Sequence, residues 1–192
     1  MVSDGADMKD SERDYLSRHR SHDVEDLLGR WREVARKARL QATTIAEVGG
    51  YPVLALANTE PNEERSALYL SAGIHGDEPA GVLGLLEWAE REPSVLATRP
   101  VVVFPCLKPW GLVHKTTLDP AGRDLNRSFQ RAELAPIQEW RELIRDRRFA
   151  VGVTLHEDYE AQGIYLYELT APGAARGEDL LGAIEGPLPL QS

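Results

Sequence analysis

The sequence has one cysteine, Cys106, and no long apolar run in its 192 residues. A single thiol excludes a disulfide within the chain and favours a reducing compartment. No apolar stretch approaches the roughly 20 residues that a membrane-spanning helix needs. The first ten residues are polar and acidic, and they lack the apolar core of a signal peptide. Together these absences predict a cytoplasmic protein that does not contact a membrane.

Positively charged residues are also scarce. Lysine and arginine number 22 against 31 aspartates and glutamates, which gives a formal net charge of -9. This balance argues against a nucleic-acid-binding protein, which needs a basic face, and it supplies no polybasic signal for a membrane surface. Hydrophobic residues make up 42% of the chain, which at this length suffices for a sizeable core. We expect a polar, flexible segment over residues 1–20 and a single domain over residues 21–192.

Strand and helix patterns alternate along the chain. Helical periodicity predicts helices over residues 23–40 and 133–147, a helix that begins near Pro79, and a short helix over residues 178–185. Short apolar or alternating runs predict strands over residues 43–48, 51–57, 67–72, 100–105, 149–155 and 163–169. Gly49 and Gly50 predict a hairpin turn between the first two strands. The fold class predicted from this order is α/β, a three-layer sandwich with a mixed, largely parallel central sheet.

The turn between the strand over residues 67–72 and the helix near Pro79 carries His75 and Glu78. An imidazole and a carboxylate three residues apart on such a turn can converge on one point, which is half of a zinc site. Two other interpretations stay open. Glu78 could instead stabilise the positive N-terminus of the helix, and His75 could be a hydrogen-bonded turn residue.

A third candidate ligand, His156, follows the predicted strand over residues 149–155. Taken alone, His156 is as well interpreted as a capped histidine at a strand end. Together with His75 and Glu78 it completes a set of two imidazoles and one carboxylate for one Zn²⁺ ion. Three protein ligands leave a fourth position for water, as a catalytic zinc requires, and zinc lowers the pKa of that water.

Residues 106–130 form a long segment without a regular pattern, and such loops in compact domains are usually functional. Asn126 and Arg127 are neighbouring polar residues in this segment. Arg127 could bind a substrate carboxylate with two parallel hydrogen bonds, and Asn126 could add an amide hydrogen bond. The alternative is a surface arginine paired with Asp124.

Three motifs in order make the chain similar to a known family: His75-Gly76-Asp77-Glu78, Asp124-Leu125-Asn126-Arg127 and the lone His156. The chain resembles the zinc carboxypeptidase family of the M14 type over residues 67–169. Within that family, its sequence is most similar to the bacterial carboxypeptidase and succinylglutamate desuccinylase/aspartoacylase branches. The resemblance implies the family's α/β fold, zinc ligation by the two histidines and Glu78, and carboxylate binding by Asn126 and Arg127.

The chain departs from the family after His156. The family's water-activating glutamate lies on a later strand, and no glutamate in the short remainder has a family-like context. We therefore expect a C-terminally shortened piece, or a shortened relative, of such an enzyme. Glu157 and Glu160 lie near His156 in sequence, and Glu157 is the substitute base that we name, although an outward, solvated carboxylate is an alternative interpretation. Asp158 could orient a ligand histidine.

The family also uses an arginine before the Asn-Arg pair to polarise the substrate carbonyl. Arg123 is the candidate in this sequence, with His114 and Lys115 as other donors in the same loop.

The predicted activity is that of a zinc-dependent hydrolase that cleaves an amide bond next to a free carboxylate in a small peptide. A deacylase of N-acyl amino acids is an alternative, because both substrates present a carboxylate near an amide. A zinc- or carboxylate-binding domain without turnover is a further alternative, since the late glutamate is missing. A purely structural module would require all three motifs to be coincidences.

Overall fold

The computed structural model describes residue 14 and residues 17–58, 66–131, 133–171, 174–184 and 189–190. Its contacts separate into two compact units, the first ending at Glu157 and the second beginning at Asp158. We describe each unit by itself. The single domain expected over residues 21–192 stays a prediction, and most of the segment expected to be flexible, residues 1–20, lies outside the described residues.

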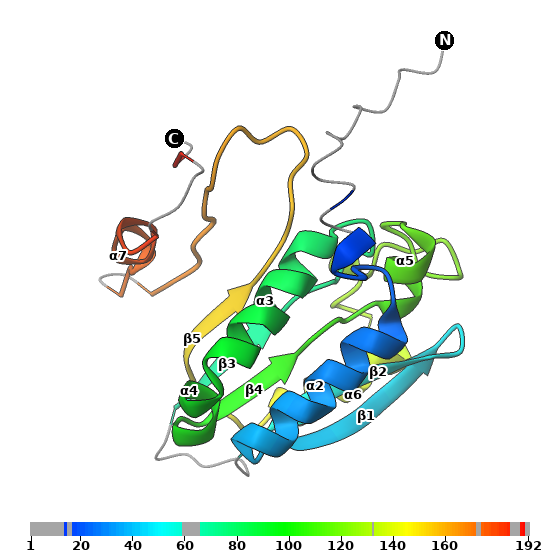
Figure 1. Ribbon diagram of the computed structural model, residues 1–192, viewed down its shortest axis with the longest axis horizontal. Coiled ribbons are helices and arrows are strands. Elements are labelled where there is room, and N and C mark those ends of the chain that lie inside the picture. Colours follow the sequence, from blue (N-terminus) through cyan, green and yellow to red (C-terminus); the bar gives the residue numbers. More distant parts are fainter. Residues whose placement is uncertain are drawn as a thin grey trace. The chain divides into compact units, whose positions relative to one another are not determined.

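The first unit is built on a five-stranded sheet with the strand order β1-β2-β4-β3-β5 (Figure 1). Its strands are β1 (Gln41–Val48), β2 (Tyr51–Ala57), β3 (Ala67–Ser71), β4 (Val101–Phe104) and β5 (Phe149–Thr154). The β1–β2 and β2–β4 pairs are antiparallel, whereas β3 lies parallel to both β4 and β5. The sheet is therefore mixed, with its parallel part in the three strands β4, β3 and β5, which confirms the predicted fold class.

The hairpin between β1 and β2 turns at Gly49 and Gly50, as predicted. Their φ angles are 61° and 84°, and Val48 pairs with Tyr51 across the turn. Positive φ at both central residues is what a two-residue hairpin turn needs, and glycine adopts it without steric cost.

Helices cover both faces of the sheet. They are α2 (Val24–Ala38), α3 (Pro79–Arg91), α4 (Pro93–Thr98), α5 (Pro109–His114) and α6 (Ala135–Ile144). Strand β4 shows the layering, because Val101 and Val103 pack in one apolar cluster with α2 and α3. Val102 and Phe104 pack in a second cluster that includes Ile137 of α6. Successive strand side chains point to opposite faces, so β4 contributes to both cores.

Helix α2 lies within the range of residues 23–40 that the sequence predicts. Asp23 is the N-cap residue, and its side chain accepts a hydrogen bond of 3.0 Å from the Asp26 N–H. Arg39 ends the helix in the left-handed conformation. The apolar residues of the helix repeat at helical spacing and form its buried face: Val24, Leu27, Leu28, Trp31, Val34, Ala35 and Ala38. Burial of this face holds the helix on the sheet.

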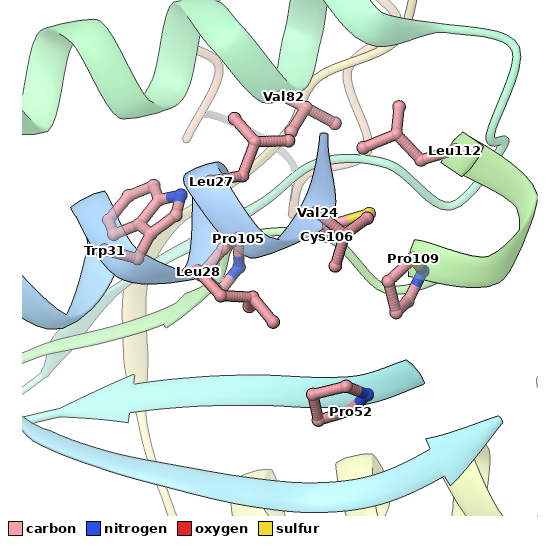
Figure 2. A pocket seen from close by; sticks show the side chains of 10 residues that line it. All are labelled: Val24, Leu27, Leu28, Trp31, Pro52, Val82, Pro105, Cys106, Pro109 and Leu112. Atoms are coloured by element: carbon pink, nitrogen blue, oxygen red, sulfur yellow. The ribbon is translucent and has the colours of Figure 1, made fainter. Parts of the chain in front are cut away.

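A small apolar pocket lies beneath α2, between this helix and the sheet (Figure 2). Trp31, Val82 and Cys106 are among its lining residues, and Pro52 of β2 lies on the opposite side. Its lining carries no charged side chain, so it is a packing gap in the core rather than a reactive site.

Three features differ from the sequence prediction. The strand predicted over residues 163–169 is wrong, because this segment makes only an isolated bridge from Ile164 to Leu190. Helices α4 and α5 were not predicted; both are short and begin with proline. In the second unit, α7 spans Gly177–Gly182, and the predicted end of that helix lies outside the described residues.

No helix in the described ranges is long and apolar enough to cross a membrane.

Candidate metal centre

Strands β3 and β5 end level with each other. Ser71 pairs with Thr154, their hydroxyl oxygens are 2.9 Å apart, and the Leu155 N–H donates to the Ser71 carbonyl at 2.9 Å. Because the two strands are parallel, the chain leaves both of them at the same edge of the sheet. This register brings the turn after β3 and the residue His156 to one place.

The turn after β3 depends on two glycines. Gly73 has a φ of 63°, and a Cβ there would lie 2.7 Å from Cys106 Sγ. A Cβ at Gly76 would lie 1.9 Å from the Gly111 carbonyl carbon, so only glycine allows α5 to approach this closely. The Gly76 N–H donates to the Thr116 carbonyl at 3.1 Å. The turn is therefore held against α5 and the residues that follow it.

His75, Glu78 and His156 converge as the sequence motifs predict. His75 Nδ1 lies 2.6 Å from Glu78 Oε1, and His156 Nδ1 lies 2.8 Å from Glu78 Oε2. The two imidazole centroids are 5.2 Å apart. Each residue offers one ligand atom, and these atoms all lie within 4.8 Å of one another. Among the described residues, this is the only group of three or more metal-ligating side chains so close together.

Glu78 is the centre of this cluster. Burial alone would raise the pKa of its carboxyl, but hydrogen bonds from His156, from His75 and from the Glu157 N–H outweigh burial and lower the pKa. The side chain of Glu78 is 14% exposed and that of His75 is 15% exposed, whereas that of His156 is 37% exposed. The cluster therefore holds an ionised carboxylate and opens toward solvent on the His156 side.

Asp124 lies beside the other ring nitrogen of His75, a position that the sequence did not predict. Its Oδ1 is 3.4 Å from His75 Nε2, which is buried and has no hydrogen bond within the described residues. Asp124 also caps the 3-10 turn Leu125–Arg127, accepting from the Asn126 N–H at 2.8 Å. A carboxylate on the second nitrogen of an imidazole is the usual partner of a metal-binding histidine.

Asn126 and Arg127 follow Asp124 within one 3-10 turn. Arg127 is exposed, and its guanidinium makes no ion pair or hydrogen bond with the described part of the chain. The structure thus does not show the pairing of Arg127 with Asp124 that was the alternative interpretation.

Other predicted site residues have defined partners. Arg123 pairs with Asp119, with Nε and Asp119 Oδ2 2.8 Å apart. Glu157 Oε2 accepts a hydrogen bond of 3.0 Å from the Ala80 N–H at the start of α3.

Asp158, in the second unit, accepts a hydrogen bond from the Tyr165 hydroxyl. His114 stacks on Trp110 and lies 2.8 Å from its carbonyl.

A family model of the succinylglutamate desuccinylase/aspartoacylase catalytic domain matches residues 64–162, about half of the chain. The chain belongs to this family. The matched residues of this desuccinylase/aspartoacylase-family chain include all three members of the histidine–glutamate cluster and the Asp124–Arg127 segment. No curated protein matches the chain in sequence.

Solved structures share the fold. A Shewanella denitrificans protein named as a putative metallopeptidase has a TM-score of 0.68 and 21% identity, over 80% of this chain and 61% of that one. A metallo-carboxypeptidase from Burkholderia cenocepacia has a TM-score of 0.60 and 18% identity, over 72% of this chain and 41% of that one.

A metallo-carboxypeptidase from Pseudomonas aeruginosa, in complex with (2-guanidinoethylmercapto)succinic acid, has a TM-score of 0.53 and 22% identity. That match covers 69% of this chain and 40% of the other. In each of these three matches, the chain spans less than two thirds of the length of the solved structure.

Proposed function

We propose that this chain is part of a zinc-dependent hydrolase that cleaves an amide bond next to a free carboxylate. One Zn²⁺ ion would be held by His75, Glu78 and His156, and the substrate carboxylate would be bound by Arg127 and Asn126. The observation that carries the proposal is the convergence of two imidazoles and one carboxylate from distant segments on one point.

The ligand set fits zinc. Imidazole nitrogen and carboxylate oxygen are ligands that Zn²⁺ accepts, and three of them leave one coordination position open. Both histidines direct Nδ1 toward the carboxylate of Glu78. When bound, zinc would lower the pKa of water and polarise a carbonyl oxygen. Asp124 would hold the His75 ring in place from its Nε2 side.

The carboxylate-binding role rests on the placement and freedom of Arg127. Its exposed guanidinium is available for two parallel hydrogen bonds with a carboxylate, and it lies within one 3-10 turn of Asp124. Arg123 is less suited, because its guanidinium is already paired with Asp119.

Glu157 as substitute base stays a prediction. In that role its carboxylate would have to exchange the hydrogen bond from the Ala80 N–H for one from water.

Metal analysis tests the proposal directly. We expect about one zinc per chain in the wild-type protein, since the site offers three ligands. His75→Ala should lose this zinc, and His114→Ala, which removes a histidine outside the cluster, should retain it. A wild-type protein without zinc, or equal zinc in both variants, would contradict the proposal.

A deacylase of N-acyl amino acids is the second candidate, and the family match favours it. Small peptides with a free C-terminal carboxylate and N-acyl amino acids should be assayed side by side. Cleavage of the acyl amino acids alone would select the deacylase. Zinc binding without cleavage of either class would leave a binding domain without turnover.

Arg127→Gln should reduce kcat/KM by roughly 10- to 100-fold, as expected for the loss of a charge-assisted hydrogen bond of about 1.5–3 kcal/mol. Arg131→Gln, at an exposed arginine paired with Glu133, is the matched control and should have no effect.

A further inference from the structure

A buried lysine follows β4, outside the cluster of His75, Glu78 and His156. Lys108 is 1% exposed, and its ammonium donates a hydrogen bond to the Thr117 carbonyl. Its stem packs closely against α5, where a Cβ at Gly111 would lie 2.7 Å from Lys108 Cε. An ammonium loses its hydration on burial, so it requires carbonyl or carboxylate partners in the protein.

Three carboxylates act on this ammonium. Burial lowers the pKa of Lys108, and the charges of Asp124, Asp77 and Asp119 oppose that shift. Asp77 belongs to the turn between His75 and Glu78, whereas Asp119 and Asp124 belong to the loop after α5. The lysine therefore supplies the opposite charge to acids from two separate segments.

Thr117 connects the same two segments by hydrogen bonds. Its carbonyl accepts from Lys108, and its Oγ1 donates to Asp77 Oδ2 at 2.6 Å. The neighbouring Thr116 carbonyl accepts from the Gly76 N–H. The loop thus contacts the histidine-bearing turn on one side and the lysine on the other.

We propose that Lys108 is a positioning residue, which holds the loop of residues 116–127 against the turn and so keeps Asp124 beside His75 Nε2. Asp119 is also paired with Arg123. Without the Lys108 cation, like-charged Asp77 on the turn and Asp124 on the loop would repel each other, and the loop would move away from the turn. The inference deepens the proposed function and rests on it, because the placement of Asp124 serves a metal only if His75 is a ligand.

The test compares Lys108→Met with Lys37→Met in the full chain. Lys37 is a half-exposed lysine of α2 that lies 3.6 Å from Glu33, so it serves as the matched control. Three quantities are measured: amide hydrogen exchange and the imidazole ¹⁵N shifts of His75, both in metal-free protein, and Zn²⁺ affinity by competition with a chromogenic chelator.

We expect Lys108→Met to speed exchange in residues 116–127 while α2 stays protected, and to change the ¹⁵N shift of His75 Nε2. The Kd for Zn²⁺ should rise on the order of 10- to 100-fold, as for other partners of metal-binding histidines. Lys37→Met should change none of the three. Lys108→Gln, which keeps a polar side chain, replaces Lys108→Met if the latter does not fold.

Unchanged exchange in residues 116–127 together with an unchanged His75 shift would overturn the proposal. Loss of protection in α2 as well, in both Lys108 variants, would also overturn it, because the lysine would then hold the whole unit. If the wild-type protein binds no Zn²⁺, the proposed function fails, while the exchange and the His75 shift in metal-free protein still decide the role of Lys108.

Discussion

The two units of the chain differ in how far their apolar side chains are buried. In the first, Leu86, Val103 and Phe104 are fully buried. In the second, Tyr167 is 90% exposed and Leu169 is 102% exposed. Both units contain runs of apolar residues with the period of a strand, but among the described residues only those of the first unit lie in a sheet. A segment with alternating apolar residues therefore forms a strand only where another strand pairs with it and other elements cover its apolar face.

The largest effect that separates the two units is a leucine truncation. Leu86→Ala in α3 should lower the free energy of unfolding by about 2–5 kcal/mol, because a buried side chain loses its contacts and leaves a cavity. Leu169→Ala should change it by less than about 0.5 kcal/mol. The four tryptophans all lie in the first unit. Urea unfolding is therefore followed by far-ultraviolet circular dichroism, which reports on the backbone of both units, and equal losses would remove the distinction between them.

A smaller effect is expected from two carboxylates that each accept two backbone N–H groups. Asp119 accepts from Ala121 and Arg123 with its side chain 6% exposed, and exposed Glu168 accepts from Arg176 and Gly177. Asp119→Ala should cost about 1.5–3 kcal/mol and Glu168→Ala less than about 1 kcal/mol, since burial strengthens hydrogen bonds to a charged group. A larger loss for Glu168→Ala in the same unfolding experiment would contradict the comparison.

The contribution of Asp119 to the free energy of unfolding should also depend on pH. Burial would raise the pKa of Asp119, but hydrogen bonds from Arg123 and Ala121 outweigh burial and lower it. The pKa in the folded protein is then below the value of about 3.9 in the unfolded chain. Its stabilisation is fully present above that value and is lost as the pH falls through the folded pKa. The stability difference between wild type and Asp119→Ala should therefore shrink below about pH 4; a constant difference would contradict this.

The smallest effect concerns thiol chemistry and leaves stability unchanged. Burial raises the pKa of Cys106 to about 12. Its thiolate is therefore rare at pH 8, and the folded protein should react with iodoacetamide only as it unfolds. In a Leu169→Cys variant the new thiol should react at the rate of a free cysteine. Mass spectrometry counts the labelled thiols, and rapid labelling of Cys106 would show that the first unit opens readily.

Most of the sheet and three residues of the candidate site could be predicted from the sequence, because their signals are local. Asp23 caps α2, the Gly49–Gly50 pair makes the hairpin, and His75 and Glu78 share one short turn. The strand over residues 163–169 was predicted wrongly, because its local pattern carried no information about a missing sheet partner. Helices α4 and α5 were missed since six residues are too few to show a helical period.

The partners of the site could not be predicted by the same reasoning. The sequence offered Asp124 only as a partner of Arg127, in the alternative interpretation, and the structure places it beside His75. Glu157 follows His156 directly, yet its carboxylate accepts from the first turn of α3. Lys108 carried no signal at all, because nothing in its neighbouring residues shows that it is buried.

The sequence by itself determined the five strands and the longer helices α2, α3 and α6 of the first unit, in their order along the chain, and the identity of the three candidate ligands. Periodicity and caps depend on residues a few positions apart, and these are present in the chain before it folds. Only the tertiary structure decided that Asp124 lies beside His75 and that Glu157 contacts α3. It also decided that Lys108 is the cation near the aspartates of the loop and the turn. Those choices join residues far apart in the chain, and they depend on strand register and on how closely loops pack, neither of which a local pattern contains.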